Sequence, residues 1–360
     1  MNDFEFTAPT RILFGRGRHR EIGELLRREV RDVKKVLLHY GGGSVKKNGV
    51  YDDVVSSLRS SCLDFVELGG VEPNPRLSLV MSGVELCRRE SVDVILAVGG
   101  GSSIDSAKAI ALGACHDGDL WDVYENRGKT ERALPVAVIL TIPAAGSESS
   151  DVSVITNEEK EQKIGYHSPH IRPILSVINP ELFFTLPKNQ IANGVADMMS
   201  HIFERYFTNT LHVDLTDALA EATLRTIVKN APAIMENPRD YDAWAEIGFS
   251  ATIAHNDLLG VGREQDWACH RLQHPLSALY DIAHGAGLAV LTPHWMRYVF
   301  RDNAGMFAQF AVKVMGVDGS YRDPESIILA GVERLGSFFR DMGLPATLRD
   351  IGIGDEKLER

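Results

Sequence analysis

The first half of the chain alternates short apolar runs with segments whose apolar residues recur every three or four positions. Apolar runs bounded by glycine or proline are typical of strands buried on both faces, and the longer spacing is typical of helices. The predicted strands are Val36–Tyr40, Phe65–Leu68, Val92–Val98 and Val136–Ile142. The predicted helices are Tyr51–Cys62, Arg76–Glu90 and Ser102–Leu112. This alternation predicts a doubly wound, mostly parallel sheet of Rossmann-like type.

The pattern changes after Pro187, where almost every segment has helical spacing. The predicted helices there are Gln190–Phe207, Asp214–Lys229, Tyr241–Leu259, Asp266–Leu279 and Gly285–Phe300. Just before the change, three more strands are predicted, as an antiparallel excursion: Val152–Thr156, Lys163–Tyr166 and Ile174–Ile178. We therefore expect an α/β Rossmann-like N-terminal domain in residues 1–185 and an all-α C-terminal domain in residues 186–360.

Composition narrows the function classes. The net charge of -11 argues against a nucleic-acid-binding surface. The four cysteines are scattered without a CxxC pair, so we expect neither a disulfide framework nor a thiolate zinc site, and a reducing cytoplasm is the default location. No signal-peptide pattern and no membrane-spanning run is visible. We expect a soluble cytoplasmic protein whose partners are small molecules.

A glycine-rich turn follows the third predicted strand. Gly99, Gly100, Gly101 and Ser102 precede a helix that contains Asp105. Backbone amides at such a helix start can hold a pyrophosphate. The standard GxGxxG fingerprint is absent, and a capping box between Ser102 and Asp105 would explain the same residues without a ligand.

A second glycine run, Gly41, Gly42, Gly43 and Ser44, follows the first strand. Two such turns at the carboxyl ends of different strands fit one dinucleotide. No carboxylate that could bind a ribose 2′-hydroxyl occurs from Val33 to Tyr51, while Lys46 and Lys47 could meet an extra phosphate. We therefore expect NADP(H) in preference to NAD(H), although two solvated lysines near a helix start would look the same.

Histidines are concentrated in the helical half. Asp197 and His201 are four residues apart, as are His270 and His274, and such pairs share one helix face. His284 follows ten residues later. Converging imidazole and carboxylate groups would suit Fe²⁺ or Zn²⁺. Each pair alone is more often a surface feature, but three histidines within an apolar stretch favour a metal site.

Taken together, these features resemble the iron-containing (group III) alcohol dehydrogenases, and within them the butanol dehydrogenase-like, NADPH-dependent aldehyde reductases. The motifs that carry the resemblance span nearly the whole chain: FEFTAPTRILFGRG, YGGGSVKKNGVYD, GGVEPNP, AVGGGSSIDSAK, IPAAGSESS, ANGVADMMSH and DWACHRLQHPLSALYDIAHGAGLAVLTPHWM.

The resemblance implies a role for each matching residue. Metal ligands are implied at Asp197, His201, His270 and His284, and a histidine beside the substrate at His274. Cofactor contacts are implied at Gly42, Ser44, Gly99, Gly100, Gly101, Ser102, Asp105, Thr141 and Lys163. The sequence departs from the family pattern at Ala145, where threonine is usual, and at Gln273, where glutamate is more typical.

The combined prediction is a homodimeric, NAD(P)-dependent and metal-dependent alcohol dehydrogenase or aldehyde reductase. The cofactor would lie in the cleft between the domains, and His274 would serve as the proton-transferring catalytic residue. Two alternatives stay open. One is a dehydroquinate synthase-like or glycerol dehydrogenase-like member of the same superfamily. The other is a non-catalytic protein that binds a metal or a nucleotide.

Overall fold

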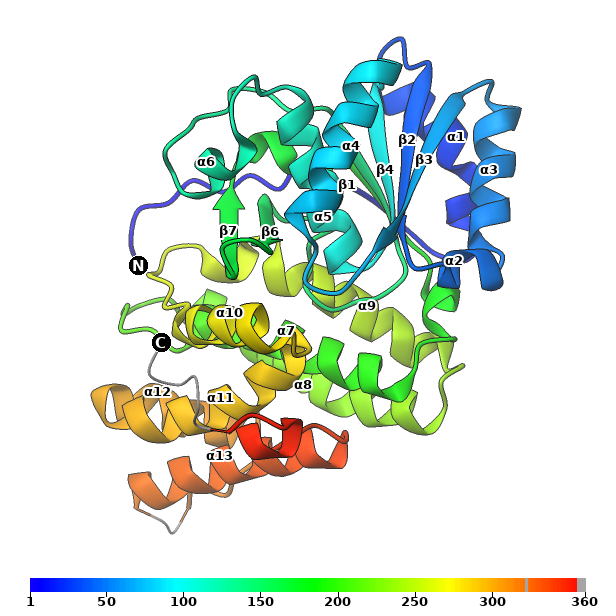
Figure 1. Ribbon diagram of the computed structural model, residues 1–360. Coiled ribbons are helices and arrows are strands. Elements are labelled where there is room, and N and C mark those ends of the chain that lie inside the picture. Colours follow the sequence, from blue (N-terminus) through cyan, green and yellow to red (C-terminus); the bar gives the residue numbers. More distant parts are fainter. Residues whose placement is uncertain (321–322, 355–360) are drawn as a thin grey trace. The chain divides into compact units, whose positions relative to one another are not determined.

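The computed structural model describes residues 1–320 and 323–354. The chain forms two compact units (Figure 1). Ala8–Thr185 make the α/β unit, and the chain from Leu186 onward makes the helical unit together with Met1–Thr7. This assignment of the first seven residues differs from the expected domain. One contact that ties these residues to the helical unit is the hydrogen bond from the Asn2 backbone N–H to the Gly262 carbonyl (2.8 Å).

A parallel six-stranded sheet, counted over the described residues, forms the centre of the α/β unit, in the order β1-β8-β5-β4-β2-β3. Its strands are β1 (Arg11–Phe14), β2 (Lys35–Gly41), β3 (Asp64–Val71), β4 (Val94–Gly99), β5 (Val136–Leu140) and β8 (Leu175–Ile178). β2 and β4 are direct neighbours, with Tyr40 paired to Val98. The chain order reverses between these two strands, and open sheets bind ligands at the carboxyl side of such a point.

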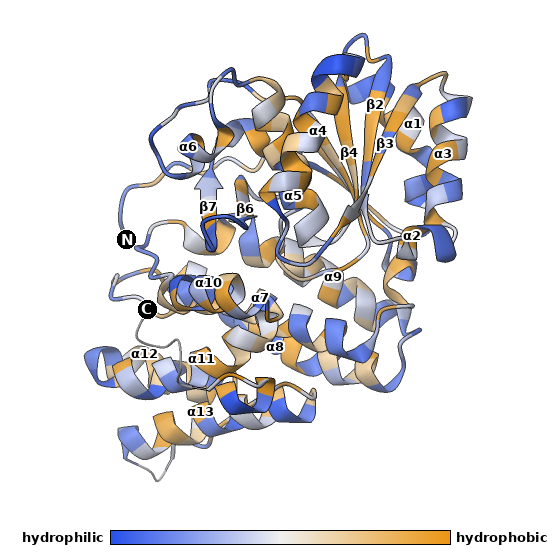
Figure 2. Cartoon of the chain, in the orientation of Figure 1, coloured by the Kyte–Doolittle hydropathy of each residue, from blue (hydrophilic) through white to orange (hydrophobic). Residues whose placement is uncertain are grey.

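Helices lie on both faces of this sheet (Figure 1). They are α1 (Ile22–Glu29), α3 (Val50–Ser60), α4 (Leu77–Glu90) and α5 (Gly101–Ala114). The short helices α2 (Ser44–Lys47) and α6 (Leu120–Tyr124) lie at the end of β2 and beside β7. Leu26 of α1 and Leu58 of α3 join a core with alternate residues of β2 and β4, such as Leu38 and Leu96. α4 and α5 lie on the opposite face. The central strands are largely apolar (Figure 2), as burial on both faces requires.

The three additional predicted strands belong to two different sheets. β6 (Val152–Asn157) and β7 (Gln162–His167) form an antiparallel ribbon, as expected. The segment predicted at Ile174–Ile178 instead forms β8, which inserts between β5 and β1 in the main sheet. The excursion is therefore one hairpin between β5 and β8.

The second unit is built from helices. They are α7 (Lys188–Tyr206), α8 (Asp214–Glu236), α9 (Tyr241–His255), α10 (Ala268–Tyr280), α11 (His284–Val299), α12 (Ala304–Lys313) and α13 (Pro324–Asp341). Short 3₁₀ turns occur in both units, at Arg18–Glu21, Pro169–Ile171, Pro180–Phe183, Leu258–Gly260, Phe300–Asn303 and Leu348–Ile351. The expected α/β-plus-α fold class is confirmed.

Several predicted boundaries are wrong for local reasons. The helix predicted to reach Leu259 ends at His255, because Asp257 adopts a left-handed conformation (φ 72°). α10 begins at Ala268 rather than Asp266, because Trp267 is also left-handed (φ 66°). α10 continues through Pro275 without interruption. β1 and α1 were not predicted from the sequence.

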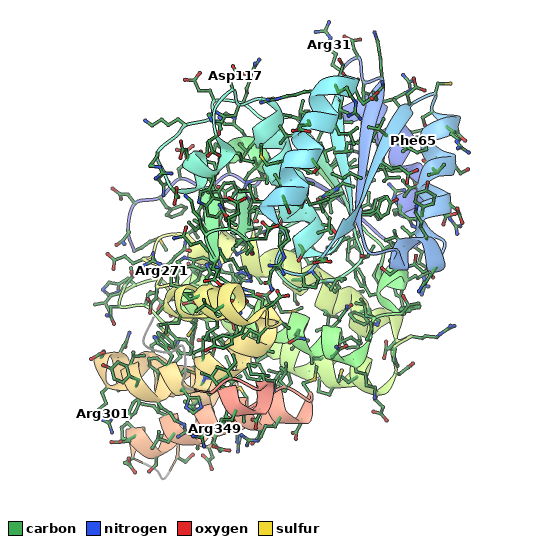
Figure 3. The ribbon with its side chains drawn as sticks, viewed as in Figure 1. Arg31, Phe65, Asp117, Arg271, Arg301 and Arg349 are labelled. Atoms are coloured by element: carbon green, nitrogen blue, oxygen red, sulfur yellow. The ribbon has the colours of Figure 1, made fainter. Side chains whose placement is uncertain are left out.

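Charged side chains reach outward over the surface of each unit, as Arg31, Asp117 and Arg301 do in Figure 3. All four cysteines lie in the described part of the chain, and each is free. Within the described residues, no helix is long and apolar enough to cross a membrane.

Candidate metal centre and glycine-rich loops

α7 supplies the first two predicted metal ligands. Asp197 and His201 are one helical turn apart, and each side chain is buried. The His201 Nδ1 atom lies 3.5 Å from the Asp197 Oδ1 atom. Spacing by four residues on a helix whose centre is almost wholly buried turns both groups toward the interior of the unit.

α10 and α11 supply the other two. His270 Nε2 lies 3.9 Å from Asp197 Oδ1, and His284 Nε2 lies 3.8 Å from the same oxygen. His284 opens α11 next to Gly285, where a Cβ atom would lie only 2.0 Å from the Asn193 carbonyl oxygen of α7. The glycine therefore permits a close approach of α11 to α7, which brings His284 to the cluster.

The four side chains fit a divalent metal ion. Asp197, His201 and His270 each offer one ligand atom within 4.8 Å of the others, and all three are buried. His284 stands outside that tight set but meets Asp197 at 3.8 Å. His201 Nδ1 and His270 Nε2 are buried and accept no hydrogen bond within the described structure. Buried polar nitrogens of this kind are costly unless a ligand satisfies them, and imidazole with carboxylate suits zinc or iron.

The surroundings of His201 favour the neutral imidazole that binds metals. Burial lowers the pKa of His201 well below its ordinary value, and His270 and Arg205 add to that effect. Arg205 is itself buried, and its Nη1 donates to the His201 carbonyl (2.9 Å). A neutral ring keeps a lone pair available at working pH.

Two residues of this region were missed by the sequence analysis. The ring of His255 packs on that of His201, with centroids 4.2 Å apart, and its Nδ1 contacts Arg205 Nη2 (3.2 Å). Glu204 Oε1 accepts a hydrogen bond from His270 Nδ1 (2.8 Å). Glu204 could have been found, because it follows Asp197 by seven residues and His201 by three, on the same face of α7. His255 has no such spacing signal.

His274 lies beside the cluster without being part of its tight set. Its ring centroid is 5.8 Å from that of His284, and the residue is half-buried on α10. His270 and Gln273 on the same helix are buried, whereas Arg271 between them is exposed and reaches away (Figure 3). His274 is thus close enough to act near the metal while remaining open to solvent.

In the α/β unit, the two glycine runs lie at the carboxyl ends of the neighbouring strands β2 and β4. A Cβ atom on Gly99 would meet Ser103 Oγ at 2.4 Å, and one on Gly100 would meet Ile142 Cβ at 2.8 Å. Thr141, directly after β5, donates its N–H to the Gly99 carbonyl (2.9 Å). These contacts shape a tight strand–turn–helix connection with amides at the start of α5.

The capping-box interpretation is wrong. α5 begins at Gly101 after an N-cap at Gly100, and no side chain caps it. Asp105 accepts instead from Ser147 Oγ (2.6 Å) and from the Val154 N–H (3.1 Å). The start of α5 therefore keeps its backbone amides uncapped by side chains, while Asp105 holds the segment that follows β5.

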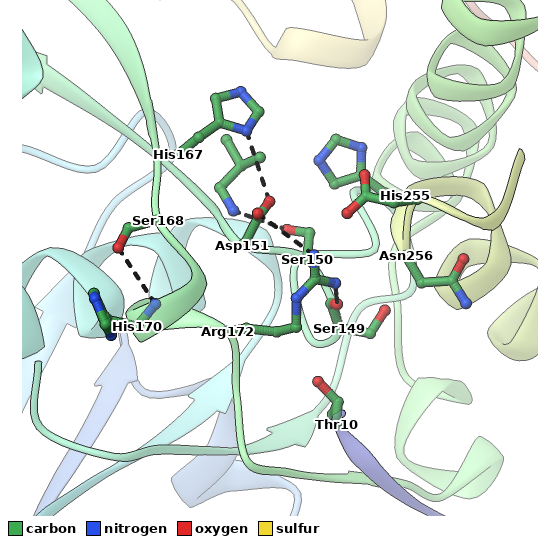
Figure 4. A network of polar contacts seen from close by, with 12 residues as sticks. Thr10, Ser149, Ser150, Asp151, His167, Ser168, His170, Arg172, His255 and Asn256 are labelled. Carbon is green, nitrogen blue, oxygen red and sulfur yellow. Dashed lines mark hydrogen bonds and ion pairs between the residues drawn. The ribbon is translucent and has the colours of Figure 1, made fainter. Parts of the chain in front are cut away.

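Buried charges on both sides fix that segment. Lys108 Nζ donates to the carbonyls of Ser147 (2.7 Å), Ser150 (2.9 Å) and Val152 (2.8 Å). Burial lowers the pKa of Lys108 to about 8. Arg172 Nη1 donates to the Ser149 carbonyl (2.6 Å), beside the ion pair between His167 and Asp151 (Figure 4). Ala145, at the start of this segment, lies against Gly101.

The turn after β2 is the one predicted to meet the ribose 2′-hydroxyl or the extra phosphate of the cofactor. Gly43 adopts φ 108°, which requires glycine, and Ser44 opens the short helix α2. Lys46 Nζ lies 3.6 Å from Glu67 Oε2 of β3. A carboxylate is therefore present near this turn, contributed by the neighbouring strand. Lys163 of β7 donates to Asn74 Oδ1 (2.9 Å).

Known proteins resemble the chain along its whole length. The model of the iron-containing alcohol dehydrogenases matches residues 9–180, and that of the C-terminal part of the Fe-containing alcohol dehydrogenase family matches residues 191–360. NADH-dependent butanol dehydrogenase A of Clostridium acetobutylicum is 43% identical, over 100% of this chain and 92% of its own. NADPH-dependent aldehyde reductase YqhD of Escherichia coli is 38% identical, over 98% and 90%.

Solved structures agree. The crystal structure of NADH-dependent butanol dehydrogenase A from Thermotoga maritima superposes with a TM-score of 0.96 at 46% identity, covering 100% of this chain and 89% of that one. That of E. coli YqhD gives 0.95 at 35%, covering 99% and 90%. Both family models and these full-length relatives lead to one conclusion: the chain belongs to the iron-containing alcohol dehydrogenase family.

Proposed function

We propose that the protein interconverts an aldehyde and a primary alcohol with a nicotinamide cofactor and one divalent metal ion. The observation that carries this proposal is the buried set of Asp197, His201 and His270, with His284 beside it. The relatives named as butanol dehydrogenases and as an aldehyde reductase support the substrate class. The glycine turns after β2 and β4 supply the elements for a dinucleotide.

When bound, the nicotinamide cofactor would supply the hydride and Fe²⁺ or Zn²⁺ would supply Lewis-acid polarisation of the substrate carbonyl. Asp197, His201, His270 and His284 would hold the metal. His274 would deliver a proton to the oxygen of the nascent alcohol and take it back in the reverse reaction, since imidazole titrates near neutral pH. Gly99, Gly100, Gly101 and Ser102 would bind the pyrophosphate through backbone amides, with Asp105 fixing the adjoining segment rather than the ligand.

We also infer a preference for NADP(H). The turn Gly41–Ser44 carries no carboxylate, and Lys46 and Lys47 follow it. Glu67 engages Lys46 at 3.6 Å, and several relatives that are 42–44% identical are named NADH-dependent, so the preference needs a direct measurement. The ratio of kcat/KM for NADPH to that for NADH decides it, and a higher value with NADH would contradict the inference.

The function itself is tested by following cofactor oxidation at 340 nm with a panel of aliphatic aldehydes. We expect sustained, aldehyde-dependent oxidation with release of the alcohol. A dehydroquinate synthase-like lyase would not consume reduced cofactor in step with an added aldehyde, and a non-catalytic binding protein would consume none. A glycerol dehydrogenase-like enzyme would prefer polyols in the oxidative direction. The expected homodimer is a separate prediction, which light scattering on the purified protein checks.

A further inference from the structure

The two histidines from α10 and α11 that approach Asp197 share one feature. The Nδ1 atom of each bonds to a buried side chain, and the Nε2 atom of each faces Asp197 Oδ1, at 3.9 Å for His270 and 3.8 Å for His284. An imidazole that donates from Nδ1 carries its lone pair on Nε2. The partner of Nδ1 therefore decides which nitrogen can bind a metal.

Glu204 is the partner of His270. Its Oε1 accepts both the backbone N–H (2.9 Å) and the Nδ1–H (2.8 Å) of His270. The Glu204 side chain is only 2% exposed. Because Oε1 accepts the backbone N–H of His270, it faces the ring as an acceptor, and His270 donates to it from Nδ1. The two bonds together fix both the tautomer and the orientation of the ring.

Gln273 is the partner of His284. Its Oε1 accepts from His284 Nδ1, and its Nε2 donates to Ser277 Oγ (2.6 Å). Ser277 Oγ in turn donates to the Ile282 carbonyl (3.2 Å). Because the only proton of that hydroxyl goes to Ile282, Ser277 must accept from the amide of Gln273. The amide oxygen therefore faces His284, and His284 must donate from Nδ1.

Packing against α11 fixes the position of the Gln273 side chain. The Gln273 side chain is fully buried, and a Cβ atom on Gly287 of α11 would lie 2.9 Å from its Cγ and 3.0 Å from its Nε2. The amide thus lies directly against the backbone of α11. Gln273 of α10 consequently has two contacts with α11, a polar one with His284 and a steric one with Gly287.

We propose that Glu204 and Gln273 are positioning residues that lock His270 and His284 in the tautomer whose Nε2 binds the metal. This inference rests on the proposed metal centre. The two positioning residues differ in charge. A carboxylate that accepts from Nδ1 makes the imidazole a stronger metal ligand than a neutral amide does. Glu204 therefore strengthens His270 as a donor, whereas Gln273 orients His284 with less electronic effect.

The test measures metal affinity rather than turnover. Metal-depleted wild type, Glu204→Gln, Gln273→Met and Gln273→Glu are titrated with Zn²⁺ against a chromophoric chelator, and the absorption spectrum of bound Co²⁺ reports the ligand geometry. Glu221→Gln is the matched control, because Glu221 is an equally buried acid of the same unit that bonds Tyr206 instead of a metal ligand (2.9 Å). Thermal unfolding without metal shows whether each variant is folded.

We expect Gln273→Met to weaken Zn²⁺ binding by about 10–100-fold, because it removes the acceptor of His284 Nδ1. Glu204→Gln keeps an acceptor for His270 but removes the carboxylate charge, so we expect it to weaken binding by about tenfold, the lower end of that range. Gln273→Glu keeps an acceptor for His284 and should bind at least as tightly as wild type, so it answers the question even if the methionine variant unfolds. Glu221→Gln should leave affinity unchanged. If Glu204→Gln and Gln273→Met both showed wild-type Zn²⁺ affinity and wild-type Co²⁺ spectra, the inference would be overturned, and the proposed metal centre would still stand. A wild type that binds neither ion would overturn the proposed metal centre, and the inference with it.

Discussion

His274 and His270 occupy successive turns of α10, yet the structure gives them different surroundings. His270 is buried, held by Glu204 and aimed at Asp197, whereas His274 is half-buried and lies beside the ring of His284. An imidazole that reaches solvent can exchange protons with it, whereas a buried imidazole bound to a metal cannot. The difference supports the proposed roles, in which His270 binds the metal and His274 transfers the proton.

We therefore predict that His274→Ala keeps its metal but lowers turnover by about 10²–10⁴-fold, the usual contribution of a general acid or base. Metal content by mass spectrometry and kcat for aldehyde reduction are the two measurements. His294→Ala is a suitable control, because His294 is an exposed histidine of α11. Loss of metal would make His274 a ligand, and unchanged turnover would remove it from the mechanism.

Individual site residues could be predicted only where their spacing is local. The pairs at Asp197/His201 and His270/His274 are visible because four residues make one helical turn. Glu67 was not found as a partner of Lys46, because it comes from the adjacent strand and 21 residues later in the sequence. His255 packs on His201 from α9, 54 positions away. Such partners become visible only when the elements are placed in space.

At the scale of elements, the strands β2 and β4 could be predicted because both contain a run of buried apolar residues, as buried parallel strands do, and His39 in β2 does not break the pattern. β1 escaped prediction because it is four residues long, with Arg11 and Phe14 exposed. Its place at the sheet edge depends on pairing with β8, more than 160 residues away. Short edge strands of this kind carry little local signal and are defined by their partner.

The turn after β2 offers a test of cofactor choice. A Cβ atom on Gly42 meets nothing within 4 Å, and Gly42 has no positive φ, so Gly42→Asp adds a carboxylate without strain. The neighbouring Gly43, at φ 108°, would not tolerate a side chain. We predict that the NADPH-to-NADH ratio of kcat/KM falls by about tenfold or more, because a like-charge contact with a phosphate costs at least ~1.4 kcal/mol. Gly42→Ala is the control for side-chain bulk. An unchanged ratio in the aspartate variant would show that the 2′-phosphate binds elsewhere.

His39 in the middle of β2 gives the α/β unit a dependence on pH. It is fully buried, its two nitrogens contact the Leu68 carbonyl (2.7 Å) and Ser106 Oγ (2.9 Å), and burial lowers its pKa to about 4. Between pH 4 and about 6.5 the unfolded chain then binds more protons at this residue than the folded one. The free energy of unfolding must therefore fall as the pH drops through that window.

The loss attributable to His39 is about 3 kcal/mol, since the pKa shift of roughly 2.5 units is worth ~1.36 kcal/mol per unit. We predict that His39→Gln, which can keep one of the two bonds, loses less stability between pH 6.5 and pH 4 than wild type does. Denaturant unfolding at a series of pH values measures this difference, with His294→Gln as the surface control. Parallel curves for wild type and His39→Gln would show that His39 does not titrate as described.

At the scale of the whole molecule, each unit contains one part of the proposed chemistry. The α/β unit carries the glycine turns at the ends of β2 and β4, and the helical unit carries Asp197 and the three histidines. Family models match both parts of the chain, and relatives cover it from end to end. The fold class followed from the change of pattern at Pro187, whereas the membership of Met1–Thr7 in the helical unit depends on contacts with distant residues such as Gly262.

The central claim is that aldehyde reduction depends on a metal held by Asp197, His201, His270 and His284. The most direct measurement is aldehyde-dependent NADPH oxidation by chelator-treated protein, before and after addition of one equivalent of Zn²⁺ or Fe²⁺, for wild type and for Asp197→Ala. We predict that wild type loses its activity with the metal and regains it on addition, while Asp197→Ala retains no metal and stays inactive. If wild-type protein kept full activity after elemental analysis had shown that it contains no metal, the account would be contradicted.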